Sequence, residues 1–363
     1  MTAQFIYLAR GRPQRPRANL VQTLHTVEAL TQAGCAVRLY LPPVPTGFAM
    51  RSFLAGMGIR HPIDLRPVQS LHSRWKGWPF ALLHRRELLR AGAVYTRVPE
   101  FSALLARHRI PHYLEVHDTA SLQGEGLIAP LLDAQQKGVL RGLTVITAAG
   151  RDALVDFGFA ADRIEVLPSG VDLAAFSAVP PPTLADFAEP HAMYVGRISY
   201  DRGLPLFQHI AHAGFPLTLI GPHDSRVQNT IPGLKVEAAI PHAEVPAALA
   251  RGSVALMPYQ AGLRHSATIS PIKLFEAMAA RRLVIASDLA PIREIVRHGE
   301  NGLLVAADDP AAWVAALTQV RADPAHAAAM AAAGHDTAQA FDWSQRARKL
   351  LAFLARTAAD RPQ

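Results

Sequence analysis

The chain has very little cysteine and no long apolar run. Cys35 is the single cysteine among 363 residues, which excludes an internal disulfide, and no Cys/His spacing resembles a zinc site. No uninterrupted apolar run approaches the roughly 18 to 20 residues that span a bilayer. The first residues, MTAQFIYLARGR, place the apolar run before the charges, unlike a signal peptide. These absences favour a cytoplasmic protein with one buried structural thiol.

Acidic residues are scarce in the first part of the chain. Residues 1–110 hold 16 Lys and Arg against 4 Asp and Glu, within a chain of formal net charge +8. Such an excess favours an anionic partner, and nucleic acid, an anionic membrane surface and a phosphorylated substrate all fit. No recognisable nucleic-acid-reading motif accompanies the charge, so we expect no nucleic-acid partner.

Length and composition predict two globular domains. The chain is 50% hydrophobic and 18% charged, as in folded proteins, and exceeds what one core usually holds. Three consecutive prolines within residues 178–190 predict a stiff, extended linker. We therefore expect domains at 1–177 and 190–335, with an amphipathic helix in 336–363 that crosses back onto the first domain. Membrane contact by this helix is the alternative.

Short apolar runs alternate with helical patterns along the whole chain. Continuously apolar strands indicate parallel sheets covered by helices on both faces, so the predicted fold class is α/β. The expected strands are residues 5–9, 37–41, 93–97, 112–116, 143–147 and 163–168, followed by AMYVGR, PLTLIG, LKVEAA, VALMPY, LVIAS and GLLV.

A phosphate-binding helix start is predicted in HSATISPIKLFEAMAARRLVIAS. Ser270 is a favoured N-cap, and Pro271 suits the first helical position. Free N–H groups and the helix dipole attract phosphate there, and Lys273 adds a cation one turn in. Glu276 follows on the same face, where its carboxylate could accept hydrogen bonds from ribose hydroxyls. A solvated helical glutamate is the alternative for Glu276.

Two arginines follow a predicted strand in AMYVGRISYDRG. The strand ends at Gly196, and Arg197 and Arg202 lie beyond its carboxyl end, where open parallel sheets bind ligands. Because arginine binds phosphate through a planar, permanently charged fork, the two side chains could converge on one pyrophosphate. Solvent-exposed loop arginines are the alternative for either residue alone.

Taken together, these motifs resemble the retaining nucleotide-sugar glycosyltransferases of the GT-B fold, in the family numbered four. The resemblance implies two facing Rossmann-like domains, the first for the acceptor and the second for the nucleotide-sugar donor. It implies no cofactor and no required metal, since no DxD-like motif is present and cationic residues can replace a metal ion. The matching pieces cover nearly the whole chain: IYLARGRP, YLEVHD, VITAAGRDAL, RIEVLPSGVDLAAF, YVGRISYDRG, SPIKLFEAMAARRLVIASDLAPIREIV, HGENGLLV and FDWSQRARKLL.

The resemblance assigns roles around the donor. Arg197 and Arg202 match the positive pair on the donor pyrophosphate. Glu276 matches the second acid of a Glu-(seven residues)-Glu pattern, which holds the ribose. Thr268 stands where the first acid is expected, a departure that puts the identity of the donor sugar, and activity itself, in question. The phosphate-binding loop is matched by Ser270, Pro271, Ile272 and Lys273.

Further residues receive roles from the same resemblance. Gly11 fits a loop that approaches the donor phosphates and the acceptor, where a missing side chain allows close backbone contact. His117 follows a strand end and matches a histidine that touches the transferred sugar. Ile240, Pro241 and His242 lie where relatives contact the nucleobase. No carboxylate nucleophile is evident on the sugar side, so the resemblance implies a front-face retaining route.

The sequence indicates the acceptor only by class. A cationic loop at 10–17 would hold a phosphorylated acceptor or form a mobile basic lid. Residues 71–90 interleave basic and apolar side chains, which suits an anionic bilayer and a lipid-linked or surface-glycan acceptor; an ordinary basic helix with core-facing aromatics is the alternative. A catalytically silent GT-B nucleotide-binding or scaffold protein and a sugar-nucleotide epimerase are the alternative functions. The side chains concerned in 71–90 are Arg74, Lys76, Arg85, Arg86 and Arg90, with Trp75, Trp78, Phe80 and Leu82.

Overall fold

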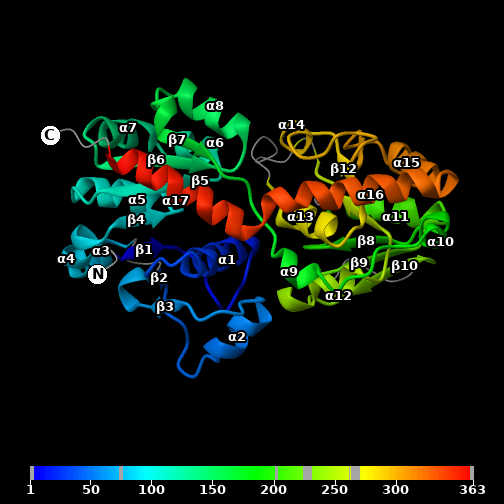
Figure 1. Ribbon diagram of the computed structural model, residues 1–363, viewed down its shortest axis with the longest axis horizontal. Helices are drawn as coiled ribbons and strands as arrows, with labels where there is room; N and C mark the ends of the chain where they lie inside the picture. Colours follow the sequence, from blue (N-terminus) through cyan, green and yellow to red (C-terminus); the bar gives the residue numbers. More distant parts are fainter. Residues whose placement is uncertain are drawn as a thin grey trace. The chain divides into compact units, whose positions relative to one another are not determined.

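The chain forms two compact units, each built on one parallel sheet, in a computed structural model (Figure 1). Unit 1 comprises Met1–Ala55, Ile59–Ser169 and Trp343–Gln363, and unit 2 comprises Gly56–Gly58 and Gly170–Asp342. The chain therefore leaves unit 1 after Ser169, builds almost all of unit 2, and returns at Trp343. The structure describes residues 4–72, 77–200, 203–223, 231–260, 262 and 270–359.

The sheet of unit 1 has seven parallel strands in the order β3-β2-β1-β4-β5-β6-β7. Strand β3 was not predicted, because its sequence DLRP is polar and it lies half exposed at the sheet edge, where Asp64 pairs with Arg38. The strands are β1 Phe5–Leu8, β2 Val37–Leu41, β3 Asp64–Pro67, β4 Ala93–Thr96, β5 His112–Val116, β6 Leu140–Val145 and β7 Ile164–Val166.

The helices of unit 1 follow its strands. They are α1 Ala18–Gln32, α2 Met50–Gly56, α3 Trp78–Leu83, α4 Arg85–Arg90, α5 Pro99–Arg107, α6 Thr119–Gly124, α7 Ile128–Gln136, α8 Ala148–Asp156 and the late helix α17 Trp343–Ala359. Cys35 is half-buried in the turn between α1 and β2, rather than fully buried as expected, and burial raises the pKa of its thiol.

Helix α17 packs onto unit 1 against α1 and β6. Leu350, Phe353 and Leu354 are buried there, and a side chain added at Gly142 of β6 would overlap Phe353. The predicted packing role of this amphipathic helix is confirmed, because its apolar face is already covered by protein. No helix in the described part of the chain is long and apolar enough to cross a membrane.

Unit 2 repeats the doubly wound plan of unit 1 with six parallel strands, in the order β10-β9-β8-β11-β12-β13. In both sheets the first and fourth strands lie side by side, which creates the switch point where such folds bind ligands at the carboxyl ends of strands. The predicted α/β class is confirmed. The strands are β8 Ala192–Val195, β9 Leu217–Ile220, β10 Leu234–Glu237, β11 Val254–Met257, β12 Leu283–Ser287 and β13 Leu303–Val305.

The predicted linker at 178–190 is wrong. Residues of this stretch form α10, Leu184–Ala188, which belongs to unit 2 and packs on α15 and α16. Its start is fixed by a capping box between Thr183 and Asp186, and Phe187 is buried in the core of unit 2. The capping and the buried Phe187 outweigh the preceding prolines, which end before the helix starts. The other helices are α9 Leu173–Phe176, α11 Leu204–His212, α12 Val245–Leu249, α13 Ile272–Ala279, α14 Ala290–Arg293, α15 Pro310–Ala322 and α16 Pro324–Ala338.

Candidate functional site

Helix α13 begins one residue later than the sequence predicted. Pro271, and not Ser270, is its N-cap, because the backbone of Pro271 is extended, with φ −81° and ψ 120°. The first helical residue is Ile272, and no side chain caps the start. Leu274 N donates to Pro271 O at 3.0 Å, so the first amides of the helix lie at Ile272 and Lys273. The predicted position of the cap is wrong, whereas the predicted helix after it is present.

Lys273 is held between two tyrosine rings. Its Nζ lies 4.2 Å from the ring centre of Tyr194 on β8 and 4.9 Å from that of Tyr259, which follows β11. The same Nζ donates to Tyr194 Oη at 3.1 Å, and Tyr194 Oη donates to the backbone oxygen of Arg197 at 3.0 Å. Cation–π contact thus fixes the ammonium group at the carboxyl ends of the first and fourth strands of this sheet.

Two glycines let the backbone come close beside this ammonium group. Gly196 has φ +156°, and a side chain there would meet Tyr194 Oη at 3.1 Å and Lys273 Nζ at 3.5 Å. Gly221, which follows β9, has φ +154°, and a side-chain carbon there would lie 1.9 Å from the backbone oxygen of Gly196. Only glycine fits at Gly221, against the backbone of Gly196, and the missing side chain of Gly196 leaves the backbone open beside the Lys273 ammonium group.

Of the two arginines predicted to bind the donor pyrophosphate, the structure describes one. Arg197 lies just past β8 with its side chain exposed to solvent. Arg202 and Thr268 lie outside the described residues. The predicted convergence of the two arginines therefore stays a prediction.

Glu276 is buried rather than solvated. Its side chain lies on α13 with 6% exposure, and its Oε1 accepts from His242 Nε2 at 2.6 Å. Burial lowers the pKa of His242, but the Glu276 carboxylate outweighs this, so the pKa of His242 is raised above its ordinary value. The ordinary alternative for Glu276 is wrong, and the sequence did not predict its ion pair.

The segment predicted to contact the nucleobase includes His242, which forms this ion pair. Ile240 is half-buried against the core of unit 2, and Pro241 is exposed. Pro241 is the N-cap of the short 3-10 helix His242–Glu244. Of the three residues, His242 reaches Glu276 through its side chain.

In unit 1, His117 is held by a buried carboxylate. His117 follows β5, and its Nε2 lies 2.6 Å from Glu115 Oε1. Burial, together with the positive charge of Arg97, lowers the pKa of His117 to about 4, so the ring is neutral at pH 7. A neutral imidazole that donates through Nε2 presents Nδ1 as an acceptor.

Glu115 is the centre of a buried network that the sequence did not predict. Burial raises the pKa of this carboxyl, but the charge of Arg346 and the hydrogen bond from His117 outweigh it, so the pKa of Glu115 lies well below its ordinary value. Arg346 of α17 donates to it at 2.9 Å, Gln22 at 2.7 Å and Tyr95 at 2.8 Å. Arg346 looked like part of the polar face of an amphipathic helix, so no local pattern could reveal this contact.

Other residues near the predicted site in unit 1 have local structural contacts. Asp118, which follows His117, is the N-cap of α6 and accepts from Ser121 N at 3.2 Å, so its role here is structural. Gly11 is buried after β1, and a side chain there would lie 2.6 Å from Leu20 Cδ1, so packing against α1 explains the glycine. Arg10 of the same loop pairs with Glu100 at 2.6 Å.

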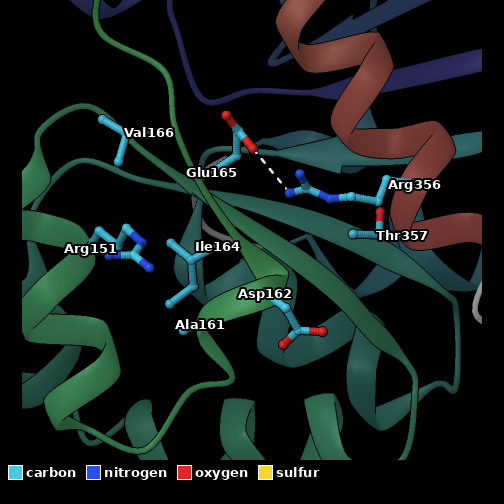
Figure 2. Close-up of a pocket in the computed structure, with 8 residues that line it drawn as sticks. All are labelled: Arg151, Ala161, Asp162, Ile164, Glu165, Val166, Arg356 and Thr357. Atoms are coloured by element: carbon cyan, nitrogen blue, oxygen red, sulfur yellow. Dashed lines mark hydrogen bonds and ion pairs between the residues drawn. The ribbon is translucent and has the colours of Figure 1, made fainter.

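The cavity shown in Figure 2 lies in unit 1, and none of its lining residues is a predicted site residue. It measures about 450 Å³ and is bordered by α8, edge strand β7 and α17. Glu165 and Arg356 form an ion pair across it at 3.1 Å. Its lining residues are Arg151, Ala161, Asp162, Ile164, Glu165, Val166, Arg356 and Thr357. Within the described residues, no group of three or more His, Cys, Asp or Glu could hold a metal ion.

Comparison with known proteins agrees with the two doubly wound sheets. A family profile described as "Glycosyltransferase Family 4" matches residues 12–175, and one described as "Glycosyl transferases group 1" matches residues 189–323. Between them the two matches take in most of both sheets. The chain therefore belongs to the family 4 glycosyltransferases and has the GT-B fold.

Sequence relatives are distant. The chain is 26% identical over 267 residues to a glycogen synthase of Mycobacterium tuberculosis, covering 66% of this chain and 62% of that protein. It is 27% identical over 293 residues to D-inositol 3-phosphate glycosyltransferase 1 of Catenulispora acidiphila, covering 69% of this chain and 68% of the relative. The match thus spans less than two thirds of the glycogen synthase.

Solved structures share the fold at low identity. Sucrose-phosphate synthase from Thermosynechococcus elongatus has a TM-score of 0.76 at 18% identity, covering 99% of this chain and all of that chain. HepE of Anabaena, solved in complex with UDP and glucose, has a TM-score of 0.71 at 15% identity, covering 98% and 100%. At these identities the similarity establishes the fold.

Proposed function

We propose that this chain is a cytoplasmic retaining glycosyltransferase that transfers a sugar from a nucleotide-diphosphate sugar to a glycan, lipid-linked or small-molecule acceptor. One observation carries the proposal. Helix α13 holds both Lys273, whose ammonium group lies against two tyrosine rings, and Glu276, whose carboxylate is buried. A nucleoside diphosphate needs both groups, a cation for the diphosphate and an acceptor for the ribose hydroxyls. The described complex of HepE with UDP and glucose supports the same donor class.

Lys273 is proposed to bind the donor diphosphate. Lys273 belongs to the first turn of α13, where the free amides favour an anion, and its ammonium group lies close to Gly196, which has no side chain. Arg197 and Arg202 are proposed to bind the same diphosphate, and Ser270, Pro271 and Ile272 to contact it mainly through backbone groups. Because these charges replace a metal ion, chelators should leave the activity unchanged.

Glu276 is proposed to bind the ribose, with His242 as its positioning residue. His242 donates to one carboxylate oxygen and so fixes the rotation of the carboxyl group. A carboxylate held in this way can accept from ribose hydroxyls without first losing side-chain freedom. Ile240 and Pro241 are proposed to border the nucleobase.

The transfer step needs no protein nucleophile in this proposal. The anomeric C–O bond to the diphosphate breaks, the acceptor oxygen bonds to the same face of the carbon, and the acceptor proton passes to the departing phosphate oxygen. Lys273, Arg197 and Arg202 stabilise the negative charge that develops on that oxygen. His117 is proposed to contact the transferred sugar, where its neutral ring accepts a hydroxyl hydrogen bond at Nδ1, and the Gly11 loop is proposed to approach the donor phosphates and the acceptor.

Binding of the donor can be tested through the ribose. UDP, GDP and ADP are first compared by thermal shift, since a ligand of the native state raises its stability. The best nucleotide and its 2′,3′-dideoxy form are then titrated into the wild type and Glu276→Gln. If Glu276 holds the ribose, the preference for the hydroxyls shrinks in Glu276→Gln but persists in Glu300→Gln, whose glutamate is exposed. An unchanged preference in Glu276→Gln would exclude the assigned role.

Measuring turnover distinguishes an active enzyme from the catalytically silent GT-B alternative. Thr268, in place of the first acid, is the observation that favours it. Slow hydrolysis of a bound nucleotide sugar, or its transfer in the presence of EDTA, is expected of the enzyme. Nucleotide binding without hydrolysis or transfer for any sugar conjugate would favour the silent scaffold.

A further inference from the structure

Helices α3 and α4 have one face in the core and one in solvent. Phe80 and Leu88 are buried in the core of unit 1, on the inner face. On the outer face, apolar side chains lie open: Trp78 is 49% exposed, Leu82 49%, Leu83 76% and Leu89 42%. We call the outer residues Trp78, Leu82, Leu83, Arg85, Arg86, Leu89 and Arg90 the α3–α4 outer face; the helices are drawn in cyan in Figure 1.

The charge of this face is of one sign. Arg85, Arg86 and Arg90 are exposed on it. Glu87 is the single acid of α3 and α4, and its carboxylate turns away to accept from Arg38 at 2.9 Å and from Tyr40 at 2.8 Å. Within the described part of the chain, this face therefore presents apolar side chains among arginines, with no acid of α3 or α4 turned toward them.

We propose that the α3–α4 outer face binds the surface of an anionic phospholipid bilayer. Leucine side chains gain free energy by entering the acyl boundary, while arginines at the same level attract lipid phosphates. A second copy of this chain fits less well, since two such faces would bring like charges together. Single-stranded nucleic acid would use aromatic stacking, whereas most of the apolar side chains here are leucines.

Packing inside unit 1 connects this face to the loop of Gly11. Gly77, just before α3, packs so closely on Phe101 that a side-chain carbon would lie 2.5 Å from the ring. The guanidinium of Arg10 lies over the same Phe101 ring, 5.2 Å from its centre. A bilayer at Trp78 would thus lie near the cationic loop, which suits a lipid-linked acceptor. That last step rests on the proposed function, whereas bilayer binding itself does not.

The test is co-sedimentation of the full chain with vesicles. The probes are vesicles of phosphatidylcholine alone and of phosphatidylcholine mixed with phosphatidylglycerol. We expect binding to the mixed vesicles, and its release by added salt in the wild type. Both Leu82→Ser with Leu83→Ser and Arg85→Glu with Arg86→Glu should lower the partition coefficient roughly tenfold or more.

A charge-matched control lies on α17. Arg348 and Lys349 are adjacent and exposed, so Arg348→Glu with Lys349→Glu makes the same change of charge elsewhere on unit 1. This control should keep its vesicle binding, and all variants should keep the wild-type nucleotide thermal shift. A failed nucleotide shift in the wild type would count against the transferase proposal and leave the vesicle result standing.

Several outcomes would overturn the bilayer proposal. Equal binding to neutral and mixed vesicles, or no release by salt, would remove the role of the arginines. Retention of single-stranded RNA without vesicle binding would identify nucleic acid as the partner. A dimer in sedimentation velocity, dissociated by the leucine substitutions and without affinity for vesicles, would make this face a contact between copies.

Discussion

Arg346 of α17 donates to Glu115 of β5 at 2.9 Å, and both side chains are almost completely buried in unit 1. The two residues are far apart in the sequence, and Glu115 also contacts His117. A single carboxylate thus joins the last helix of the described chain to a predicted substrate-binding residue.

Removing Arg346 should destabilise unit 1 strongly. Arg346→Met leaves the Glu115 carboxylate buried without its main positive partner, which is expected to cost about 3 to 5 kcal/mol. Urea unfolding followed by circular dichroism measures the change. Arg348→Met, on the exposed side of the same helix, should stay within about 0.5 kcal/mol of the wild type. Equal stability of the two variants would show that Glu115 is held well enough by its other donors.

His112 should make folding less favourable in acid. Burial lowers its pKa to about 4, and its Nε2 accepts from Ser102 Oγ at 2.7 Å while Nδ1 donates to the oxygen of Ile110 at 2.8 Å. As pH falls below about 6.5, His112 binds a proton in the unfolded chain but stays neutral in the folded chain. The free energy of unfolding therefore falls by up to about 3 kcal/mol at pH 4.

The His112 prediction is checked by stability measured at several pH values. His112→Gln should show a flatter profile between pH 6.5 and 4 than the wild type, even if it starts lower. Parallel profiles would show that another group carries the dependence, of which His117 is the nearest candidate, with its pKa also lowered to about 4.

His242 should titrate in the opposite direction. Its pKa is raised by Glu276, so the ion pair contributes stability below the ordinary pKa of histidine and loses it as pH rises through the raised value. NMR titration of the imidazole measures this pKa directly. Glu276→Gln should bring it down, because burial then acts without the carboxylate. An unchanged pKa would mean that another charge, such as Asp172, dominates.

Lys273 should carry more of the nucleotide affinity than the tyrosines that hold it. Lys273→Met is expected to weaken binding of the preferred nucleoside diphosphate about tenfold or more, since a charge-assisted bond contributes about 1.5 to 3 kcal/mol. Tyr194→Phe removes the hydroxyl that Lys273 contacts but keeps the ring, so it should weaken binding less. Isothermal titration calorimetry compares the two, and a larger loss in Tyr194→Phe would contradict this assignment.

Most of the fold could be predicted, because continuous apolar runs such as FIYL at 5–8 and VALM at 254–257 are typical of parallel strands buried on both faces. Strand β3 could not, since an edge strand with a polar sequence lacks that signal. The helix in the predicted linker was missed because the pattern of prolines was given more weight than the capping box at Thr183.

The candidate site was predictable only where its groups lie close together in the sequence. Lys273 and Glu276 lie on one helix, so spacing was enough to relate them. The contacts of Lys273 with Tyr194 and of Glu276 with His242 depend on strand order, which brings distant segments to one sheet edge. Glu115 is the single acid in the largely apolar strand β5. A buried acid predicts a positively charged or hydrogen-bonding partner, but the sequence does not indicate that this partner is Arg346.

The return of the chain at Trp343 sets the order in which the two units can be completed during translation. Arg346 leaves the ribosome only after all of Gly170–Asp342 has been made, so unit 2 can fold while the Glu115 carboxylate still lacks its guanidinium. Until then, the surface of α1 that later packs on α17 stays open to water or to a chaperone. The unit that begins first in the sequence is therefore the one that matures last.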